Sequence, residues 1–195
     1  PQIYGKGYLP DHPPASRITE IGKQLVAVVK QIDTSRPVTA ALAGVVMSNE
    51  VGYPEVLDLV GYNYQEFRYK DDHARYPNRI IYGSENSMAD STWSAVADND
   101  FISAQFLWTG IDYMGEAHRW PNRSSGSGLL DMGGFKKPEF YFRQSLWSDK
   151  PMVYIGTGQV PNRPGRENHN AGANWNWDAG RQVQVSCFTN CEEAE

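Results

Sequence analysis

The sequence predicts an α/β fold built on a parallel sheet. From residue 16 to residue 148, segments with helical spacing alternate with short apolar runs, which is typical of strands joined by crossover helices. The apolar runs are rich in β-branched and aromatic residues, as in strands that are buried on both faces. After residue 150 the alternation stops. With 195 residues, the chain has room for one core, or for one core and part of a second.

Helices are expected between the apolar runs. Residues 16–32 form the clearest one, with Ser16 as the N-cap and an end before Pro37. Further helices are expected at residues 49–57 and 65–78, and residues 86–100 form either a helix or a long loop. Pro138 fits the first turn of a helix that runs to about Trp147. The apolar face of the first helix contains Ile18, Ile21, Leu25, Val28, Val29 and Ile32.

Four strands are expected, at residues 38–42 and 58–64, at the run Ile80-Ile81-Tyr82, and within residues 101–110. In the third, Gly83 and Ser84 end the apolar run and place Glu85 near the C-terminal edge of the strand. That edge of a parallel sheet commonly carries the chemistry. The alternative is a surface acid just beyond a strand.

The chain changes character toward its end. Residues 111–135 form a long irregular stretch, and such loops are usually functional. Strands are expected at residues 151–155 and 181–188. The strand at 181–188 is expected to have Val183, Val185 and Cys187 on one face. The segment between them is rich in Gly, Pro and Asn. We therefore divide the chain into a first domain at 1–155, and a linker with the first strands of another domain at 156–195.

Composition excludes several classes of protein. A net charge of −5 without a basic cluster argues against a nucleic-acid surface. No apolar run approaches the length of a membrane span, and the four histidines have no zinc spacing, so no metal site is expected. The first residues contain neither a start methionine nor a signal peptide, and we expect a longer parent chain. The chain has 6 Trp, 11 Tyr and 7 Phe, and aromatic rings in loops suit sugar-like ligands.

Four helix–strand units are half of an eight-stranded barrel. A doubly wound sheet also explains the alternation, but the sequence lacks a glycine-rich phosphate turn between a strand and a helix. Tyr64, Glu85 and Trp108 each lie at the C-terminal end of a successive predicted strand. A barrel assembles its active site in this way.

An ordered set of segments resembles glycoside hydrolase family two, in particular its β-galactosidase-like members. The segments are GYNY at 61–64, IYGSE at 81–85, QFLWTGIDYMGE at 105–116, GLLD at 128–131, GFKKP at 134–138, NWNW at 174–177 and TNC at 189–191. The resemblance implies the second half of a (β/α)8 TIM barrel, followed by the beginning of an Ig-like β-sandwich. It also implies a retaining glycosidase that hydrolyses terminal β-D-galactosides by double displacement.

The resemblance also implies roles for single residues. Glu85 matches the nucleophile, and Tyr64 matches a tyrosine that hydrogen-bonds it. Trp108, Glu116 and Asn63 form the expected substrate-binding set. Three of these residues have a plainer alternative: a core tyrosine for Tyr64, packing at the barrel rim for Trp108, and an ion pair with Arg119 or His118 for Glu116.

The chain departs from the family pattern at its start. The resemblance places the acid/base glutamate and barrel strands one to four before Pro1, so this fragment alone is expected to be inactive. The residues after Leu42 are Ala-Gly-Val-Val, where relatives often have a polar sugar contact. Alternatives are therefore β-glucuronidase, β-mannosidase, a non-catalytic carbohydrate-binding fragment or a protein-interaction domain.

The partners expected from this interpretation are a carbohydrate substrate, the missing barrel half and the flanking sandwich domains of the parent chain. A homo-oligomer is a further expectation, whereas nucleic acid and membrane are not expected. No cofactor is predicted, since nothing in the sequence specifies the Mg²⁺ or Na⁺ that some relatives use. The compartment stays open between a periplasmic or secreted location and the cytoplasm.

Overall fold

The structure, a computed structural model, describes residues 13–160, 169 and 171–193. The chain forms two compact units, Pro1–Leu107 and Trp108–Glu195, which are described separately. Part of the segment rich in Gly, Pro and Asn after residue 155 lies outside the described residues. The helices are α1 (Ser16–Ile32), α2 (Val45–Glu50), α3 (Tyr69–Arg75), α4 (Asp90–Ala97) and α5 (Pro138–Trp147), with short 3-10 turns η1 (Pro54–Val56) and η2 (Glu66–Arg68).

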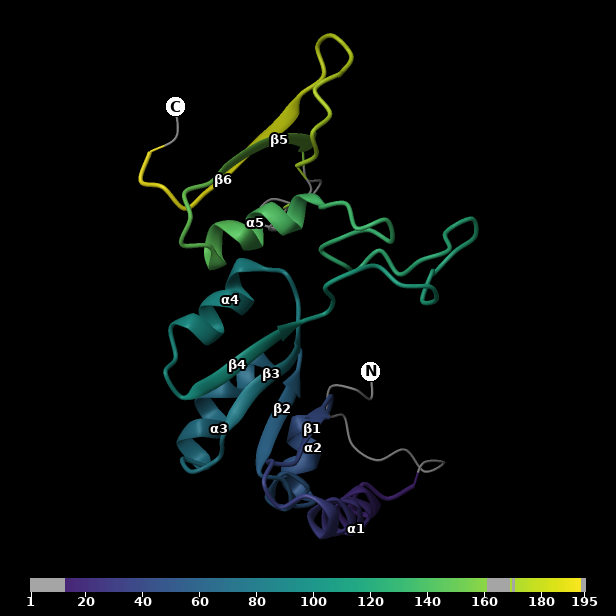
Figure 1. Cartoon of the computed structure of the whole chain (residues 1–195), viewed down its shortest axis with the longest axis vertical. Coiled ribbons are helices and arrows are strands. Elements are labelled where there is room, and N and C mark those ends of the chain that lie inside the picture. The colour runs from purple at the N-terminus through teal and green to yellow at the C-terminus, as the bar shows by residue number, and fades with distance from the viewer. Residues whose placement is uncertain (1–12, 161–168, 170, 194–195) are drawn as a thin grey trace. The chain divides into compact units, whose positions relative to one another are not determined.

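The first unit is built on a four-stranded parallel sheet (Figure 1). The strands β1 (Thr39–Leu42), β2 (Leu59–Asn63), β3 (Ile81–Asn86) and β4 (Ile102–Leu107) lie side by side in chain order. The predicted mixed α/β class with a parallel sheet is therefore confirmed. Because all three neighbouring pairs are parallel, the C-terminal ends of the four strands lie at one edge of the sheet.

The core of this unit lies on one face of the sheet. Side chains from all four strands pack there against Val45 of α2 and Tyr69 of α3. Ile81 of β3 is fully buried, whereas Ile80, the residue before that strand, is 49% exposed and Phe106 of β4 is 59% exposed. The prediction that the strands are buried on both faces is therefore wrong at Ile80 and Phe106, whereas in the centre of β2 three consecutive residues, Val60 to Tyr62, are buried. The buried strand residues are Leu42, Val60, Tyr62, Ile81 and Ile102.

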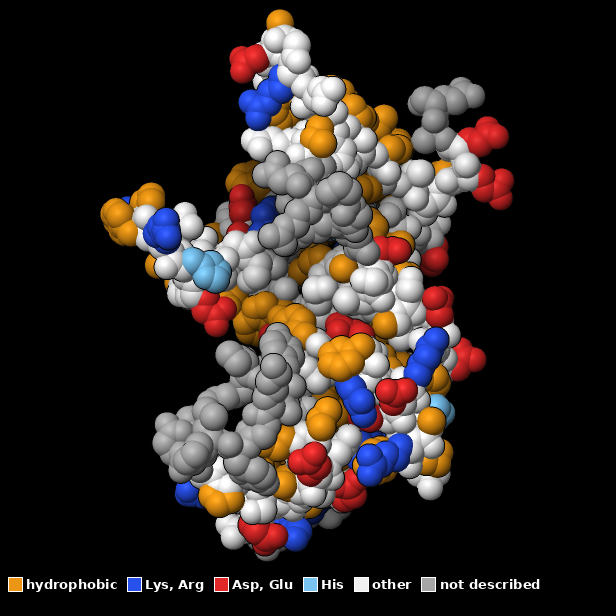
Figure 2. Space-filling view, turned by 180° about the vertical axis from the view of Figure 1, so that it is seen from behind, with side chains coloured by type: hydrophobic (Ala, Val, Ile, Leu, Met, Phe, Trp, Pro, Cys, Tyr) orange, Lys and Arg blue, Asp and Glu red, His pale blue; other side chains and the backbone are white. Residues whose placement is uncertain are grey.

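Helix α1 has the predicted bounds but presents an unexpected face. It begins at Ser16 after Ala15, without a side-chain cap, so Ser16 is not the N-cap. Thr19 and Gly22 are the buried positions, and the Thr19 hydroxyl donates to the Val51 carbonyl at 2.8 Å. The predicted apolar face is exposed, among other hydrophobic side chains at the surface (Figure 2). Its members are Ile18, Ile21, Leu25, Val28, Val29 and Ile32.

The shorter elements follow the prediction less closely. Instead of one helix at 49–57, the chain forms α2 and then η1, because Gly52 turns the backbone with a φ of +70° and Pro54 starts a new turn. The helix expected at 65–78 is confirmed as η2 and α3, which end before Pro77. Residues 86–100 contain α4, the helical one of the two alternatives.

The second unit contains a long loop, α5 and a two-stranded antiparallel sheet. The predicted helix from Pro138 to Trp147 is confirmed as α5. The sheet pairs β5 (Val153–Gln159) with β6 (Val183–Thr189). Val185 and Cys187 are exposed, whereas Phe188 is buried against the ring of Phe142 from α5, with centroids 5.6 Å apart. The face that contains Val183, Val185 and Cys187 is therefore not the packed face of β6.

Candidate active site

Glu85 lies within β3, one residue before its end. The sequence predicted that Gly83 and Ser84 end the strand, but β3 continues to Asn86. Glycine is required at position 83 because a Cβ there would lie 1.8 Å from Oδ1 of Asn86 and 2.8 Å from the hydroxyl of Tyr69. The conclusion about the edge of the sheet still holds, since Glu85 is near the C-terminal end of a parallel strand.

A bulge in β3 brings two consecutive residues to the same neighbour. Tyr62 pairs with Gly83, but the next residue, Asn63, pairs with Glu85, so Ser84 is an extra residue in β3. Nδ2 of Asn63 donates to Oε2 of Glu85 at 3.1 Å, and the Ser84 hydroxyl donates to Oδ1 of Asn63 at 2.8 Å. The half-buried carboxylate of Glu85 therefore has an oriented amide donor from the adjacent strand.

Tyr64 is tied to Glu85 through the backbone. Its N–H donates to the carbonyl of Glu85 at 2.8 Å. Tyr64 has a φ of +52°, in the left-handed region that side chains other than glycine rarely adopt. Strained backbone of this kind is concentrated at functional sites. The predicted pair of Tyr64 and Glu85 is thus adjacent at the sheet edge, and the bond from the phenol to the carboxylate stays a prediction.

Trp108 and Glu116 belong to the second unit, where Tyr113 joins them. Trp108 is the residue that follows β4 in the chain, and its ring meets the ring of Tyr113 edge-on, with centroids 5.8 Å apart. The Tyr113 hydroxyl donates to Oε2 of Glu116. This hydrogen bond, with a smaller effect of burial, raises the pKa of Tyr113. Glu116 itself is exposed and has a φ of +47°.

An ion pair holds the loop in which these residues lie. Nζ of Lys137 donates to Oδ1 of Asp112 at 2.9 Å and to the carbonyl of Gly126 at 2.8 Å. The Gly128 N–H donates to the same carboxylate oxygen at 2.6 Å. The side chain of Asp112 is 8% exposed. Asp112 and Lys137 together join three parts of the loop.

Two residues at the site were missed by sequence reasoning. Ser84 was interpreted as a small residue that ends a strand, although its hydroxyl orients Asn63. Tyr113 was counted among loop aromatics, although it binds Glu116. Position beside a predicted acid was the available signal for Ser84. Nothing in the local pattern singles out Tyr113.

The described residues contain no group of three or more His, Cys, Asp or Glu side chains placed to hold a metal ion. In the same part of the chain, no helix combines the length and the apolar character needed to cross a membrane.

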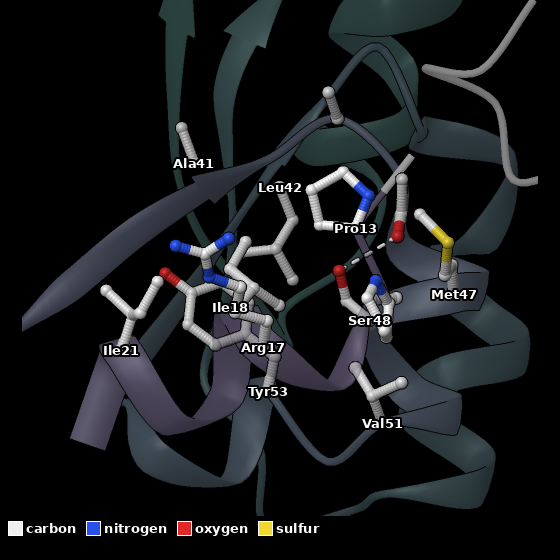
Figure 3. A pocket seen from close by; sticks show the side chains of 14 residues that line it. Pro13, Arg17, Ile18, Ile21, Ala41, Leu42, Met47, Ser48, Val51 and Tyr53 are labelled. Atoms are coloured by element: carbon white, nitrogen blue, oxygen red, sulfur yellow. Dashed lines mark hydrogen bonds between the residues drawn. The ribbon is translucent and has the colours of Figure 1, made fainter. Parts of the chain in front are cut away.

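The first unit also contains a pocket of about 640 Å³ between α1, the end of β1 and α2 (Figure 3). Its walls are largely apolar, with Ile18, Ile21, Leu42 and Met47 among the side chains that face it. Glu85, Tyr64 and Asn63 are not part of its lining. The pocket and the candidate active site are therefore distinct features of this unit.

Comparison with known proteins places these observations in context. No family model matches the chain. The chain is 30% identical to the β-galactosidase BoGH2A of Bacteroides ovatus over 216 aligned residues, which cover 86% of this chain and 24% of that protein. A second match, to a putative β-glucuronidase of Formosa agariphila, is 42% identical over 67 residues and covers 32% of this chain and 6% of that protein.

Solved structures that resemble this chain are glycoside hydrolases as well. A member of glycosyl hydrolase family 2 from Bacteroides cellulosilyticus superposes with a TM-score of 0.75 at 31% identity, covering 90% of this chain and 26% of that one. The β-glucuronidase of Bacteroides uniformis superposes with a TM-score of 0.62 at 20% identity, covering 72% and 21%, a likeness of fold alone. The chain spans about a quarter of the length of the relatives that it matches over most of its own length.

Proposed function

Because this chain belongs to glycoside hydrolase family two, we propose that it supplies the nucleophile of a retaining glycosidase, and that the nucleophile is Glu85. One observation carries the proposal. The carboxylate of Glu85 lies near the C-terminal end of a parallel strand, with the Asn63 amide donating to it at 3.1 Å. A strand end holds a carboxylate within the small positional tolerance that attack on an anomeric carbon demands.

The mechanism is double displacement. The Glu85 carboxylate attacks the anomeric carbon, a carbon–oxygen bond forms, and the leaving oxygen departs with a proton from a second carboxylic acid about 5 Å away. Water, deprotonated by that second group, then hydrolyses the glycosyl-enzyme with overall retention. We assign the second group to the parent protein before Pro1, as the family resemblance implies. The Asn63 amide orients the Glu85 carboxylate for this attack, and we propose that the phenol of Tyr64 is a second donor to it.

The substrate we propose is a terminal β-D-galactoside. It is supported by the match to BoGH2A, a β-galactosidase, over 86% of this chain. The shorter match to a putative β-glucuronidase keeps β-glucuronides as the second candidate, with β-mannosides third. Trp108 offers an apolar ring to a sugar face, and the exposed Glu116 offers a carboxylate to sugar hydroxyls. A non-catalytic sugar-binding fragment would not need the ordered donors at Glu85.

We further propose that residues 1–155 are the second half of a TIM barrel and that residues 156–195 begin an Ig-like β-sandwich. The unreversed order of the four parallel strands supports the first part, because a doubly wound sheet reverses its order. The exposed apolar face of α1 and the pocket beside β1 fit the missing barrel half as their cover. The antiparallel pair of β5 and β6 supports the second part.

The test is covalent trapping in the complete protein. An activated 2-deoxy-2-fluoro β-galactoside forms a glycosyl-enzyme that hydrolyses slowly, and peptide mapping is expected to find the label on Glu85. Glu85→Gln is expected to abolish both labelling and turnover. Aryl β-glucuronides and β-mannosides run in parallel decide specificity. A label on another carboxylate, or an active Glu85→Gln variant, would show that the assignment is wrong.

A further inference from the structure

The Asn63 side-chain amide has a nitrogen that donates hydrogen bonds and an oxygen that accepts them, and only the nitrogen can bind a carboxylate. Its nitrogen donates to Oε2 of Glu85 at 3.1 Å. If the amide turned over, its oxygen would face the ionised carboxylate, and two acceptors would oppose each other. The favourable orientation therefore requires a donor for the oxygen at the far end. That donor is the Ser84 hydroxyl, 2.8 Å from Oδ1 of Asn63.

The geometry of β3 explains how Ser84 reaches this position. Consecutive residues in a regular strand point to opposite faces of the sheet, so Ser84 and Glu85 would not share a partner. The bulge between Gly83 and Glu85 adds one residue to β3 and removes this restriction. The two residues then contact opposite ends of the same amide.

Gly61 provides the space that the Ser84 side chain occupies. A Cβ at position 61 would lie 2.5 Å from Oγ and 2.6 Å from Cβ of Ser84. Even alanine at this position of β2 would therefore push the Ser84 side chain of β3 away. Gly61 on β2 and the bulge in β3 therefore both position the Ser84 hydroxyl. Ending a strand would require neither feature.

We propose that Ser84 is a positioning residue that acts on the nucleophile through Asn63. Its hydroxyl holds the amide so that the N–H faces Glu85 before the sugar arrives. This inference rests on the proposed role of Glu85 and adds a step to it. The site is preorganised by the chain Ser84–Asn63–Glu85, in which each group has its hydrogen-bonding partner.

The experiment is a double-mutant cycle in the complete protein. The probe is the 2-deoxy-2-fluoro analogue of whichever aryl β-galactoside, β-glucuronide or β-mannoside the protein hydrolyses fastest, because labelling reports nucleophilic attack. We expect Ser84→Ala to slow labelling roughly tenfold, and to lower kcat with little change in KM, since the bond acts mainly in the transition state. Ser84→Thr keeps the hydroxyl and is expected to remain within a factor of about three.

The cycle distinguishes positioning from a general loss of stability. In an Asn63→Ala background, Ser84→Ala is expected to add nothing, because the amide through which it acts is gone. A variant that only weakens the fold would slow both backgrounds alike. Ser103→Ala is the matched control, since Ser103 lies on β4 and its hydroxyl donates to the Ile81 carbonyl at 3.0 Å.

The outcomes separate the two proposals. If the label maps to Glu85 and Ser84→Ala labels at the wild-type rate, the nucleophile assignment holds and the role of Ser84 is refuted. Equal losses in the two Asn63 backgrounds refute it as well. If the label maps to another carboxylate, both proposals are wrong.

Discussion

Asp72 is a charged residue with no solvent exposure in the first unit. Its carboxylate accepts hydrogen bonds from the Tyr62 hydroxyl at 2.8 Å, from Nδ2 of Asn49 at 3.2 Å and from the Arg68 guanidinium at 2.7 Å. Arg79 extends the network by donating to Tyr62 and Asn49. A buried carboxylate is tolerated only with such partners, and removal of one member leaves the others unsatisfied.

We therefore expect Asp72→Ala to lower the free energy of unfolding by about 3 kcal/mol. Asp71→Ala is the matched control, because Asp71 is 73% exposed and lies 3.6 Å from the same Arg68. It is expected to change stability by less than about 0.5 kcal/mol. The measurement is urea denaturation of the complete protein, followed by circular dichroism. Equal midpoints for the two variants would contradict this account.

Tyr69 makes stability depend on alkaline pH. Burial raises its pKa from 10.0 to about 12, with the nearby Glu66 acting in the same direction and a hydrogen bond from Asn86 opposing both. The unfolded chain then loses this proton at lower pH than the folded chain does. The stabilising contribution of the neutral phenol is thus complete below pH 10.0 and is lost as the pH rises toward about 12. Burial raises the pKa of Tyr62 as well.

We expect the free energy of unfolding to fall between about pH 10 and pH 12, and Tyr69→Phe to flatten part of that fall. The check is a series of urea midpoints from neutral to alkaline pH for both proteins. At neutral pH the phenol is protonated in both states, so measurements there provide the baseline. An unchanged alkaline slope in Tyr69→Phe would show that Tyr69 is not responsible.

The loop between β4 and α5 is held by an ion pair between Lys137 and Asp112. Lys137 lies just before α5 and binds Asp112 and the carbonyl of Gly126, so it joins the two ends of a segment that carries Tyr113 and Glu116. Both charged side chains are largely enclosed, at 24% and 8% exposed. Removing one member of such a pair costs more than breaking a surface ion pair, because the other charge is left enclosed without its partner.

We expect Lys137→Met to destabilise the loop by about 2 kcal/mol, because it leaves the Asp112 carboxylate without its cation. Chymotrypsin can cut the loop after Tyr113, and its initial cleavage there is expected to become at least about tenfold faster. Lys136→Met is the control at the neighbouring exposed position, and it leaves every aromatic residue in place. Loop cleavage that is equally fast in the two variants would argue against the clamp.

For the chain as a whole, the main feature is apolar surface that the described residues leave uncovered. The six apolar residues of α1 are all at least 42% exposed, and Ile32 reaches 86%. Among the described residues, β1 and β4 lie at the two ends of the sheet, so each has one edge without a paired strand. Exposure of this much apolar surface to water raises the free energy of the folded chain. An uncovered strand edge is in addition a template for association.

We expect residues 1–195, purified alone, to self-associate and to have no glycosidase activity. The solution mass should exceed 21.9 kDa, and the double substitution Leu25→Glu and Ile32→Glu should reduce it toward that value. Gln24→Glu, at an exposed polar position of α1, is the matched control. Without a proton donor, hydrolysis loses about 10²–10⁴-fold. Monomeric protein with turnover that Glu85→Gln abolishes would contradict this, and Glu116 would become the first candidate for the acid.

The sequence by itself determined most of the secondary structure. The bounds of α1 and α5, the four parallel strands in their order and the antiparallel strand at the end were predictable. Helical spacing, β-branching and the position of a proline are local properties that act over a few residues. The position of Glu85 near a strand end follows from the same local pattern, although Gly83 and Ser84 gave the wrong end of the strand.

Tertiary structure alone decided which side chains meet. Asn63 contacts Ser84 and Glu85 about twenty positions away, and Asp112 contacts Lys137 across the loop. These partners depend on sheet register and on a bulge, which local periodicity does not encode because a shift of one residue turns each side chain to the other face. The exposure of the apolar face of α1 could not be predicted from the sequence either. Helical spacing shows that a face is apolar, whereas only the positions of the other elements decide what covers it.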